Sequence, residues 1–406
     1  MNYYIVKDNY NYNYKLQPKG SCVNDTRQTC LLYIVKDNTI IFSPEYNELL
    51  DSNLLSQYKK VIFSNYMLDE YLFDKYESNN FINLHHKDST FNHQVNNLPN
   101  ILTHLVFGYY FNQSVDNLPN SLTHLVFDYY FNQSVDKLPE YLTHLTFGAY
   151  FDKLVNNLPN TLTHLTFDGG FDNPLDNLPM QLTHLTFGYM FNNRVDNLSK
   201  QLTHLTFGDY FNKSVDNLPE YLTHLTFSDH FNKPVDKLPK HLTHLIFGYC
   251  FNHPVNNLPN SLTYLTFGHY FNHPVDQLPN SITHLTFGHY FNQEVNNLPN
   301  TLTYLNLNCN NQYLIDNLPN GIEELVLEAY FNLELNNLPT SIKSILFKIS
   351  NYDKELNCLP NFVELIQLPY NYDKKILKIP KKLKKIICWH NYKFIKDFDN
   401  LNIETY

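Results

Sequence analysis

Several residue types are scarce in this 406-residue sequence, and each scarcity argues against a class of protein. The six cysteines, at positions 22, 30, 250, 309, 358 and 388, have no Cys-x-x-Cys spacing, so we expect reduced thiols and no zinc site. Arginine, the preferred reader of phosphates and guanine edges, occurs only as Arg27 and Arg194, and the net charge is −10. We therefore expect no nucleic-acid partner.

Long apolar runs are also missing. No stretch reaches the length of a transmembrane helix, and the opening MNYYIVKDNY lacks the basic and apolar segments of a signal peptide. Asn112, Asn132 and Asn212 stand in Asn-x-Ser sequons, but the repeat pattern below gives them buried structural roles that a glycan would disrupt. These features predict no membrane partner and a cytoplasmic location.

Motifs for catalysis are absent from the sequence as well. It contains no P-loop, no Gly-x-Ser-x-Gly, no His-Glu-x-x-His, and no unique Cys–His pair or carboxylate pair outside the repeated pattern described below. A residue that is copied in many identical surroundings is a poor candidate for a single catalytic base. We expect no enzyme activity, no catalytic residues, no cofactor and no resident metal.

What the sequence does contain is a repeat of 20 residues. From residue 91 to 350 the pattern Phe-Asn-x-x-Val-Asp/Asn-Asn-Leu-Pro-x-x-Leu-Thr-His-Leu-Thr-Phe-Gly-x-Tyr recurs thirteen times without an insertion. Weaker copies follow it, and Tyr58-x-x-Val61-x-Phe63 resembles a worn strand before it. We divide the chain into an N-terminal cap region (1–57), degenerate entry repeats (58–90), thirteen regular repeats (91–350), and degenerate repeats with a Lys-rich C-terminal cap (351–406).

Each repeat predicts one short strand. In residues 123–127 the alternation points Leu125 and Phe127 inward and His124 and Val126 outward. A proline in almost every repeat disfavours a helix on the other side of the coil and favours an extended or polyproline segment. Because one unit cannot bury its own apolar face, the units must stack. The sequence therefore predicts an all-β solenoid, a right-handed leucine-rich-repeat-like coil with a parallel sheet on one face.

The asparagine that follows the first phenylalanine of each repeat is predicted to form a structural ladder. An inward amide at a coil corner can pair with backbone groups of neighbouring coils that would otherwise be buried without a partner. The residues assigned to this ladder are Asn112, Asn132, Asn192, Asn212, Asn232, Asn252, Asn272 and Asn292.

Phe251 to Val255, FNHPV, followed by Leu-Pro-x-x-Leu-Thr-x-Leu-Thr-Phe-Gly, resembles the FNIP-repeat family. The resemblance is strong over 91–350 and weak over 351–390. The family is leucine-rich-repeat-like and typical of social amoebae and of giant DNA viruses of amoebae. Some viral members carry an N-terminal F-box, which implies a ubiquitin-ligase adaptor as partner, but residues 1–57 show no F-box pattern and look strand-like instead.

The predicted function is a protein-interaction scaffold with a protein partner, because the sheet face offers a long rigid surface with variable aromatic residues beside it. Two alternatives stay open: a ubiquitin-ligase substrate receptor, and a structural or metal-buffering histidine array. The candidate partner-binding residues are His124, His144, His164, His184, His204, His224, Tyr130, Tyr150, Tyr210 and Tyr270.

Overall fold

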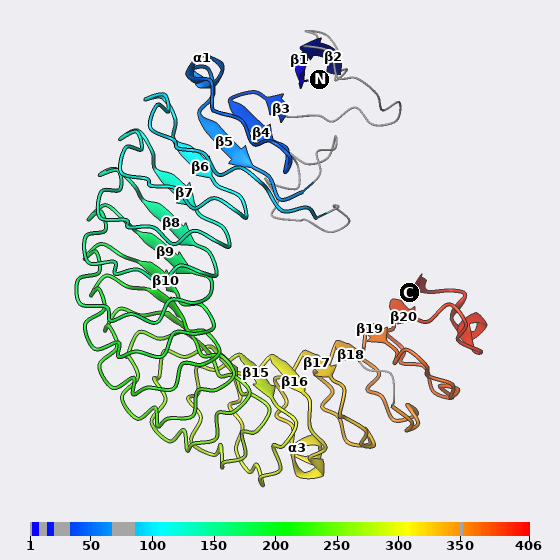
Figure 1. Ribbon diagram of the computed structural model, residues 1–406. Helices are drawn as coiled ribbons and strands as arrows, with labels where there is room; N and C mark the ends of the chain where they lie inside the picture. The colour runs from blue at the N-terminus through cyan, green and yellow to red at the C-terminus, as the bar shows by residue number, and fades with distance from the viewer. Residues whose placement is uncertain (1, 8–13, 20–32, 67–85, 349–351) are drawn as a thin grey trace. The chain divides into compact units, whose positions relative to one another are not determined.

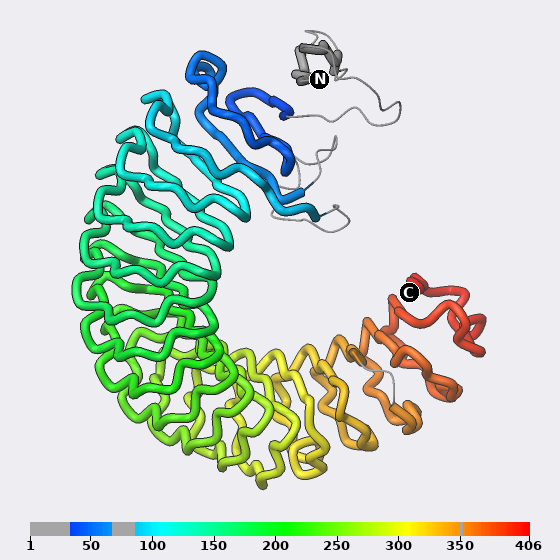
Figure 2. The backbone as a smooth tube through the Cα atoms, in the orientation of Figure 1, coloured from blue at the N-terminus to red at the C-terminus, as the bar shows by residue number. Residues whose placement is uncertain are grey.

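The computed structural model describes residues 2–7, 14–19, 33–66, 86–348 and 352–406 (Figure 1). The chain divides into two compact units. The N-terminal unit comprises Met1–Asn193 with Asn197–Leu202, and the C-terminal unit comprises Arg194–Asp196 with Thr203–Tyr406. Within each unit, successive turns of the backbone have a similar outline and lie side by side as a stack of coils (Figure 2). The predicted solenoid is therefore confirmed.

Each regular coil contributes one strand of three or four residues, as the alternating pattern predicts. The strands of the N-terminal unit are β3 (Tyr33–Lys36), β4 (Thr39–Phe42), β5 (Lys60–Phe63), β6 (His104–Val106), β7 (His124–Val126), β8 (His144–Phe147), β9 (His164–Phe167) and β10 (His184–Thr186). Those of the C-terminal unit are β11 (His204–Thr206), β12 (His224–Thr226), β13 (His244–Ile246), β14 (Tyr264–Thr266), β15 (His284–Phe287), β16 (Tyr304–Leu307), β17 (Glu324–Leu327), β18 (Ser344–Phe347), β19 (Leu365–Gln367), β20 (Lys385–Cys388) and β21 (Asn402–Thr405).

The regular strands pair in parallel with a constant register. His124 lies opposite His144 in the N-terminal unit, and His224 lies opposite His244 in the C-terminal unit. Each pairing joins residues that are one repeat apart, so identical side chains form columns along the sheet. This register follows from the uninterrupted repeat, because a slip of one residue would turn every inward leucine outward.

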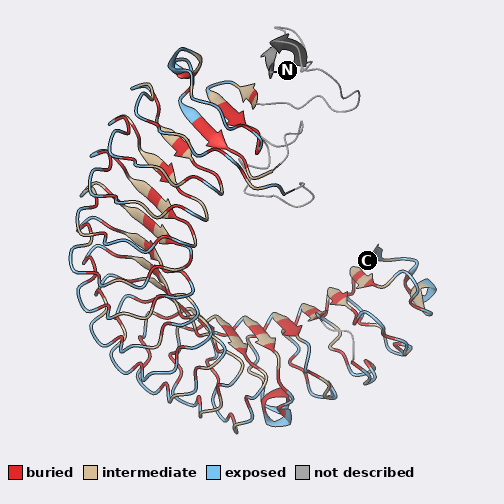
Figure 3. Cartoon of the chain, in the orientation of Figure 1, coloured by how far each residue is buried: buried red, intermediate tan, exposed pale blue. Residues whose placement is uncertain are grey.

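Stacked phenylalanine rings fill the core. Phe127 and Phe131 are fully buried, with ring centroids 3.7 Å apart and an interplanar angle of 7°. The next coil repeats the arrangement with Phe147 and Phe151, also 3.7 Å apart, and Phe131 stacks on Phe151 at 6.1 Å. The buried segments run along the interior of every coil, and the turns are exposed (Figure 3). Each ring stabilises the fold by roughly 1.5–3 kcal/mol through burial alone.

The side of the coils opposite the sheet is extended in most repeats, but one repeat contains a helix. Helix α3 (Gln312–Asp316) stands where other repeats have an irregular segment, so the expectation of extended structure is wrong for this coil. Asn311 caps it, because its side-chain oxygen accepts a hydrogen bond from the Leu314 amide at 3.2 Å. None of the described helices is long and apolar enough to span a membrane.

The first described segments are strand-rich. β1 (Asn2–Lys7) and β2 (Tyr14–Lys19) form an antiparallel pair, β3 and β4 form a second one, and β4 starts the parallel sheet by pairing with β5. Lys60 of β5 lies opposite His104 of β6, so the worn strand at residues 58–63 does join the sheet. Helix α1 (Ser52–Leu55) is a single turn capped by Asp51. The division of the chain at residues 57 and 90 stays a prediction.

The C-terminal coils end in paired charges. The structure closes with the 3-10 helix η1 (Ile395–Phe398) and β21, which pairs with β20. Three lysines of the Lys-rich C-terminal cap make ion pairs: Lys375 with Asp397 at 3.1 Å, Lys384 with Glu364 at 2.6 Å, and Lys385 with Glu404 at 2.5 Å. Because these pairs are exposed, each contributes at most about 1 kcal/mol to stability.

The asparagines form a hydrogen-bonded ladder, but at the surface. The side-chain oxygen of Asn112 accepts a bond from the Asn132 amide at 3.0 Å, and Asn212 does the same for Asn232 at 3.0 Å. The predicted burial of these residues is wrong, because each of them is exposed or half-buried. The corner turns just after the buried phenylalanine, so the amide lies along the rim of the coil. The argument that a glycan on Asn112, Asn132 or Asn212 would invade the core therefore fails.

The exposure of the ladder sets the expected cost of breaking it. Asn232 accepts a bond from the Asn252 amide at 3.0 Å, and water can replace that bond in part. We expect Asn232→Leu to lower the free energy of unfolding by about 0.5–1.5 kcal/mol. Asn257→Leu, an exposed position outside the ladder, should cost less. Urea unfolding of both variants measures the difference, and the reverse ranking would show that the ladder does not stabilise the stack.

Candidate protein-binding face

Stacked imidazole rings line the outward face of the sheet. In the N-terminal unit His104, His124, His144, His164 and His184 occupy one column, and each neighbouring pair has ring centroids 4.1 Å apart with an interplanar angle of 11°. The rings are half-buried. The parallel strands place the Cβ atoms in a row, and each ring leans onto the next.

The C-terminal unit has the same column with two substitutions. His204, His224 and His244 stack at 4.1 and 4.2 Å. Tyr264 and Tyr304 then replace histidine, and the centroid distances to their histidine neighbours increase to 5.3–5.7 Å. The face that we define here as the sheet face consists of this column in both units and the Thr/Val/Ile positions two residues further along each strand.

A threonine beside each histidine fixes the orientation of the ring. The hydroxyl of Thr123 lies 2.9 Å from Nδ1 of His124 and 3.1 Å from the carbonyl oxygen of Thr103 on the preceding coil. The same pair of contacts recurs at Thr143 and Thr163. Each ring is therefore tied to the neighbouring coil through one nitrogen, and the column is rigid.

Partial burial makes these histidines hard to protonate. The pKa of His104 is lowered to about 4, mainly because burial removes water around the ring, and also because of the neighbouring His124 and Lys60. Desolvation also lowers the pKa values of His124, His144, His164, His184 and His244. Where repulsion from neighbouring histidines also lowers a pKa, it comes second to burial. These six rings are thus uncharged at neutral pH.

The four candidate tyrosines lie in the turns that follow the strands. Tyr130 stacks on Tyr110 at 5.3 Å and packs against Tyr150 at 5.0 Å, in the N-terminal unit. In the C-terminal unit, Tyr210 stacks on His230 at 5.0 Å and Tyr270 on Tyr290 at 5.1 Å. All four are exposed; Tyr150 retains 52% of its accessible surface. The structure thus forms a second aromatic column next to the sheet face in each unit.

Stacking bears on the metal-buffering alternative. Within the described ranges no group of three or more His, Cys, Asp or Glu side chains is arranged to hold a metal ion. Parallel rings 4.1 Å apart direct their nitrogen lone pairs along parallel lines, whereas the ligands of one ion must converge on it.

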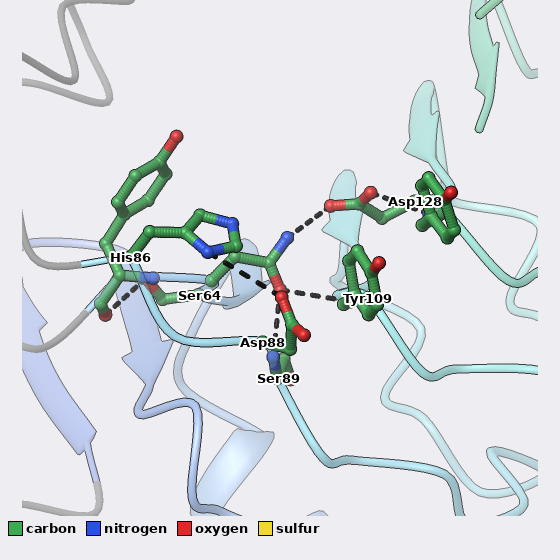
Figure 4. A network of polar contacts seen from close by, with 9 residues as sticks. Ser64, His86, Asp88, Ser89, Tyr109 and Asp128 are labelled. Carbon is green, nitrogen blue, oxygen red and sulfur yellow. Dashed lines mark hydrogen bonds and ion pairs between the residues drawn. The ribbon is translucent and has the colours of Figure 1, made fainter. Parts of the chain in front are cut away.

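A polar network joins the first coils of the N-terminal unit (Figure 4). The side-chain oxygen of Asn65 accepts bonds from the Ser89 and Tyr109 amides, each at 3.0 Å, and its NH2 group donates to Asp128. Burial raises the pKa of Asp128. Asn65 thereby links three successive coils.

The same network brings a serine, a histidine and an aspartate into one region. His86 Nδ1 lies 3.6 Å from Asp88, while the Ser64 hydroxyl donates to the Tyr66 carbonyl at 2.8 Å and accepts from the Tyr66 amide at 2.9 Å. These contacts of Ser64 within its own turn support a structural role for the network.

Our reading of the sequence missed a hollow in the C-terminal unit. Asp229, Asn306, Asn308 and Glu328 lie around it. Three of them depart from the repeat, because Asn306 stands at a threonine position and Asn308 and Glu328 stand at a glycine position. These departures from a regular repeat are the signal by which the sequence could have indicated the hollow.

The ubiquitin-ligase alternative depends mostly on the first 57 residues. Residues 1, 8–13 and 20–32 lie outside the described part of the chain, and residues 33–57 form β3, β4 and α1. The described segments are strands and one short helical turn, as the strand-like sequence predicts.

Comparisons with known proteins agree with the repeat pattern. The FNIP Repeat family model matches residues 91–130, 131–170, 214–250, 251–277 and 271–310. The crystal structure of CroV588, described as a novel circular leucine-rich-repeat protein and coming from a giant virus, is 34% identical, with a TM-score of 0.73. The match covers 89% of this chain but 54% of CroV588, so the chain spans about half the length of that protein.

Two bacterial leucine-rich-repeat proteins are more distant. YopM from Yersinia enterocolitica is 21% identical over 71% of this chain and 74% of its own, with a TM-score of 0.46. The functional domain of InlJ from Listeria monocytogenes is 17% identical over 68% of this chain and 64% of its own, with a TM-score of 0.47. No curated protein sequence matches the chain. Repeat folds of this type are typical of protein-interaction scaffolds. The chain carries FNIP repeats and folds as a β-solenoid of the leucine-rich-repeat type.

Proposed function

We propose that the protein is a non-enzymatic scaffold that binds a protein partner through the sheet face and the adjoining tyrosines. The observation that supports this most directly is the row of stacked, half-buried rings on the sheet of each unit. Hot spots of protein interfaces are rich in aromatic side chains that are already held in place, because little side-chain entropy is lost on binding. Both aromatic columns have this property.

The variable turn residues would supply specificity. The strand positions are nearly identical from coil to coil, whereas the residue pairs after the strand change, as in Tyr129-Tyr130, Ala149-Tyr150 and Asp209-Tyr210. A partner that spans several coils would contact the same aromatic side chains on every strand and different side chains in the turns beside them. We also propose that residues 1–57 cap the solenoid and that the protein is located in the cytoplasm.

Affinity purification with mass spectrometry tests the proposal when it compares matched variants. A face variant of the N-terminal unit carries His124→Gln, His144→Gln, Tyr130→Ser and Tyr150→Ser. The control carries Tyr141→Ser, a tyrosine with 65% of its surface exposed in the turn before a strand. We expect the partner recovered with the wild-type protein to be lost from the face variant and retained by the control. Equal recovery with both variants would exclude this face as the interface.

A further inference from the structure

One hollow of the C-terminal unit differs in chemistry from the rest of the sheet face. It has a volume of about 340 Å³ and lies where the strands β14 to β16 end. The outward residues there are Thr266, Thr286 and Asn306, which are neighbours in the parallel register. Ile246 precedes this row and Val326 follows it. Aliphatic side chains thus bound a polar row of three coils, and we call the hollow the acceptor pocket.

Glycines keep the floor of the acceptor pocket open. Gly248, Gly268 and Gly288 occupy the first turn position after three successive strands. A Cβ atom on Gly268 would lie 1.7 Å from the carbonyl oxygen of Gly248, and one on Gly288 would lie 2.0 Å from that of Gly268. No side chain fits at these points without a shift of the backbone, so none fills the hollow from below.

The walls carry negative charge and hydrogen-bond acceptors. Asp229 and Glu328 line the pocket at its two ends, and no lysine or arginine lines it. Tyr249 and His269 form an aromatic wall with ring centroids 4.3 Å apart and an interplanar angle of 7°. Burial lowers the pKa of His269, so its ring does not neutralise the carboxylates at neutral pH.

The side chains of Asn306 and Glu328 together present hydrogen-bond acceptors that suit a donor from another molecule. The amide NH2 group of Asn306 donates to Glu328 at 2.9 Å and orients that carboxylate. The side-chain oxygen of Asn306 is buried and accepts no hydrogen bond from the described residues. A buried acceptor without a donor costs about 1–3 kcal/mol. A ligand that brings N–H groups would recover part of that cost.

We propose that the acceptor pocket receives one arginine side chain of the protein partner. A guanidinium has five N–H donors in a plane, accepts nothing, pairs with carboxylates through two bonds, and stacks on aromatic rings. The pocket offers the carboxylate of Glu328, the unpaired amide oxygen of Asn306 beside it, and an aromatic wall. This inference rests on the proposed protein-binding role and adds the chemistry of the partner.

Lys348, which lies one coil after Glu328, does not fill the pocket. Lys348 is exposed, and no ion pair joins it to Glu328 in the described part of the chain. Lys348→Ala should therefore leave arginine binding unchanged. A marked gain of affinity in this variant would mean that Lys348 competes for the pocket and would count against a vacant acceptor site.

Ligand-observed saturation-transfer NMR tests the pocket with defined probes. The probes are the N-acetyl methylamides of arginine, of lysine and of citrulline, the uncharged isostere of arginine. We expect saturation transfer to the arginine probe, a weaker effect on lysine, and none on citrulline. Equal effects with arginine and citrulline would refute a charged occupant, and equal effects with arginine and lysine would refute a guanidinium site.

Matched variants locate the binding. Glu328→Gln, and Asn306→Thr, which restores the residue found at positions 266 and 286, should each weaken arginine binding by about fivefold or more. Glu334→Gln removes the same charge from an exposed position of the next repeat and should have no effect. Thermal melts show whether each variant is folded, and unchanged binding in folded Glu328→Gln protein would overturn the proposal.

The two proposals can fail separately. If the face variants lose the protein partner but the arginine probe does not bind, the scaffold role stands and the acceptor pocket is refuted. If the probe binds through Glu328 but the face variant retains the partner, the pocket stands as an arginine site and the sheet face of the N-terminal unit is not the interface.

Discussion

Deletion of residues 124–143 should leave a folded protein that is one coil shorter. The deletion joins Thr123 to His144, so the sequence continues in register and β6 pairs with β8 as it now pairs with β7. Apart from the hydrogen bond from Asn65 to Asp128, which the deletion removes, each coil depends on contacts with its neighbours, and the phenylalanine stack can close over the gap with identical residues. We expect the circular dichroism spectrum to keep its shape and the melting temperature to change little.

Deletion of residues 124–133 should be far more damaging. It removes Leu125, Phe127 and Phe131 but leaves Val135 and Leu142, which pack against them from the other half of the coil, and all five are buried. The remaining half-coil cannot complete a turn, and its apolar side chains meet water. The loss of several buried side chains should cost on the order of 5 kcal/mol or more. Equal tolerance of the two deletions in thermal melts would refute a stack of independent 20-residue coils.

Acid should destabilise the folded protein through the histidine column. The folded-state pKa values of six column histidines, among them His124, His144 and His164, lie below the usual value of about 6.5, and that of His104 is about 4. Between those values the unfolded chain binds more protons than the folded chain, so unfolding is favoured as the pH falls. The contribution of the column to stability is complete above about pH 6.5 and is lost progressively towards about pH 4.

Glutamine substitutions in the column isolate this effect. The triple variant His124→Gln, His144→Gln, His164→Gln should lose less stability than the wild type between about pH 7 and about pH 5. A control variant replaces His93, His253 and His273, which lie outside the column, and should retain the acid sensitivity of the wild type. Urea unfolding at the two pH values measures both. The same pH dependence in all three proteins would mean that the stacked rings are not responsible.

The local pattern of the repeat was sufficient to predict the coil. Alternation around Leu125 and Phe127 determines which side chains point inward, and an uninterrupted spacing of 20 residues determines which residues become neighbours. Both depend on interactions that the chain repeats identically in every unit. The position of the histidines on the outward face followed for the same reason.

Other features depend on side chains from different coils and were decided only by the tertiary structure. The path of the corner backbone decided that the Asn132 side chain lies at the rim and not inside. The separation of the coils decided that burial, rather than repulsion, dominates the histidine pKa values. The acceptor pocket needs Asn306 and Glu328, which belong to successive coils and meet only when the coils stack. The repeated residues determine how the coils stack. The residues that depart from the repeat, such as Asn306 and Glu328, form a pocket only because stacking brings them together.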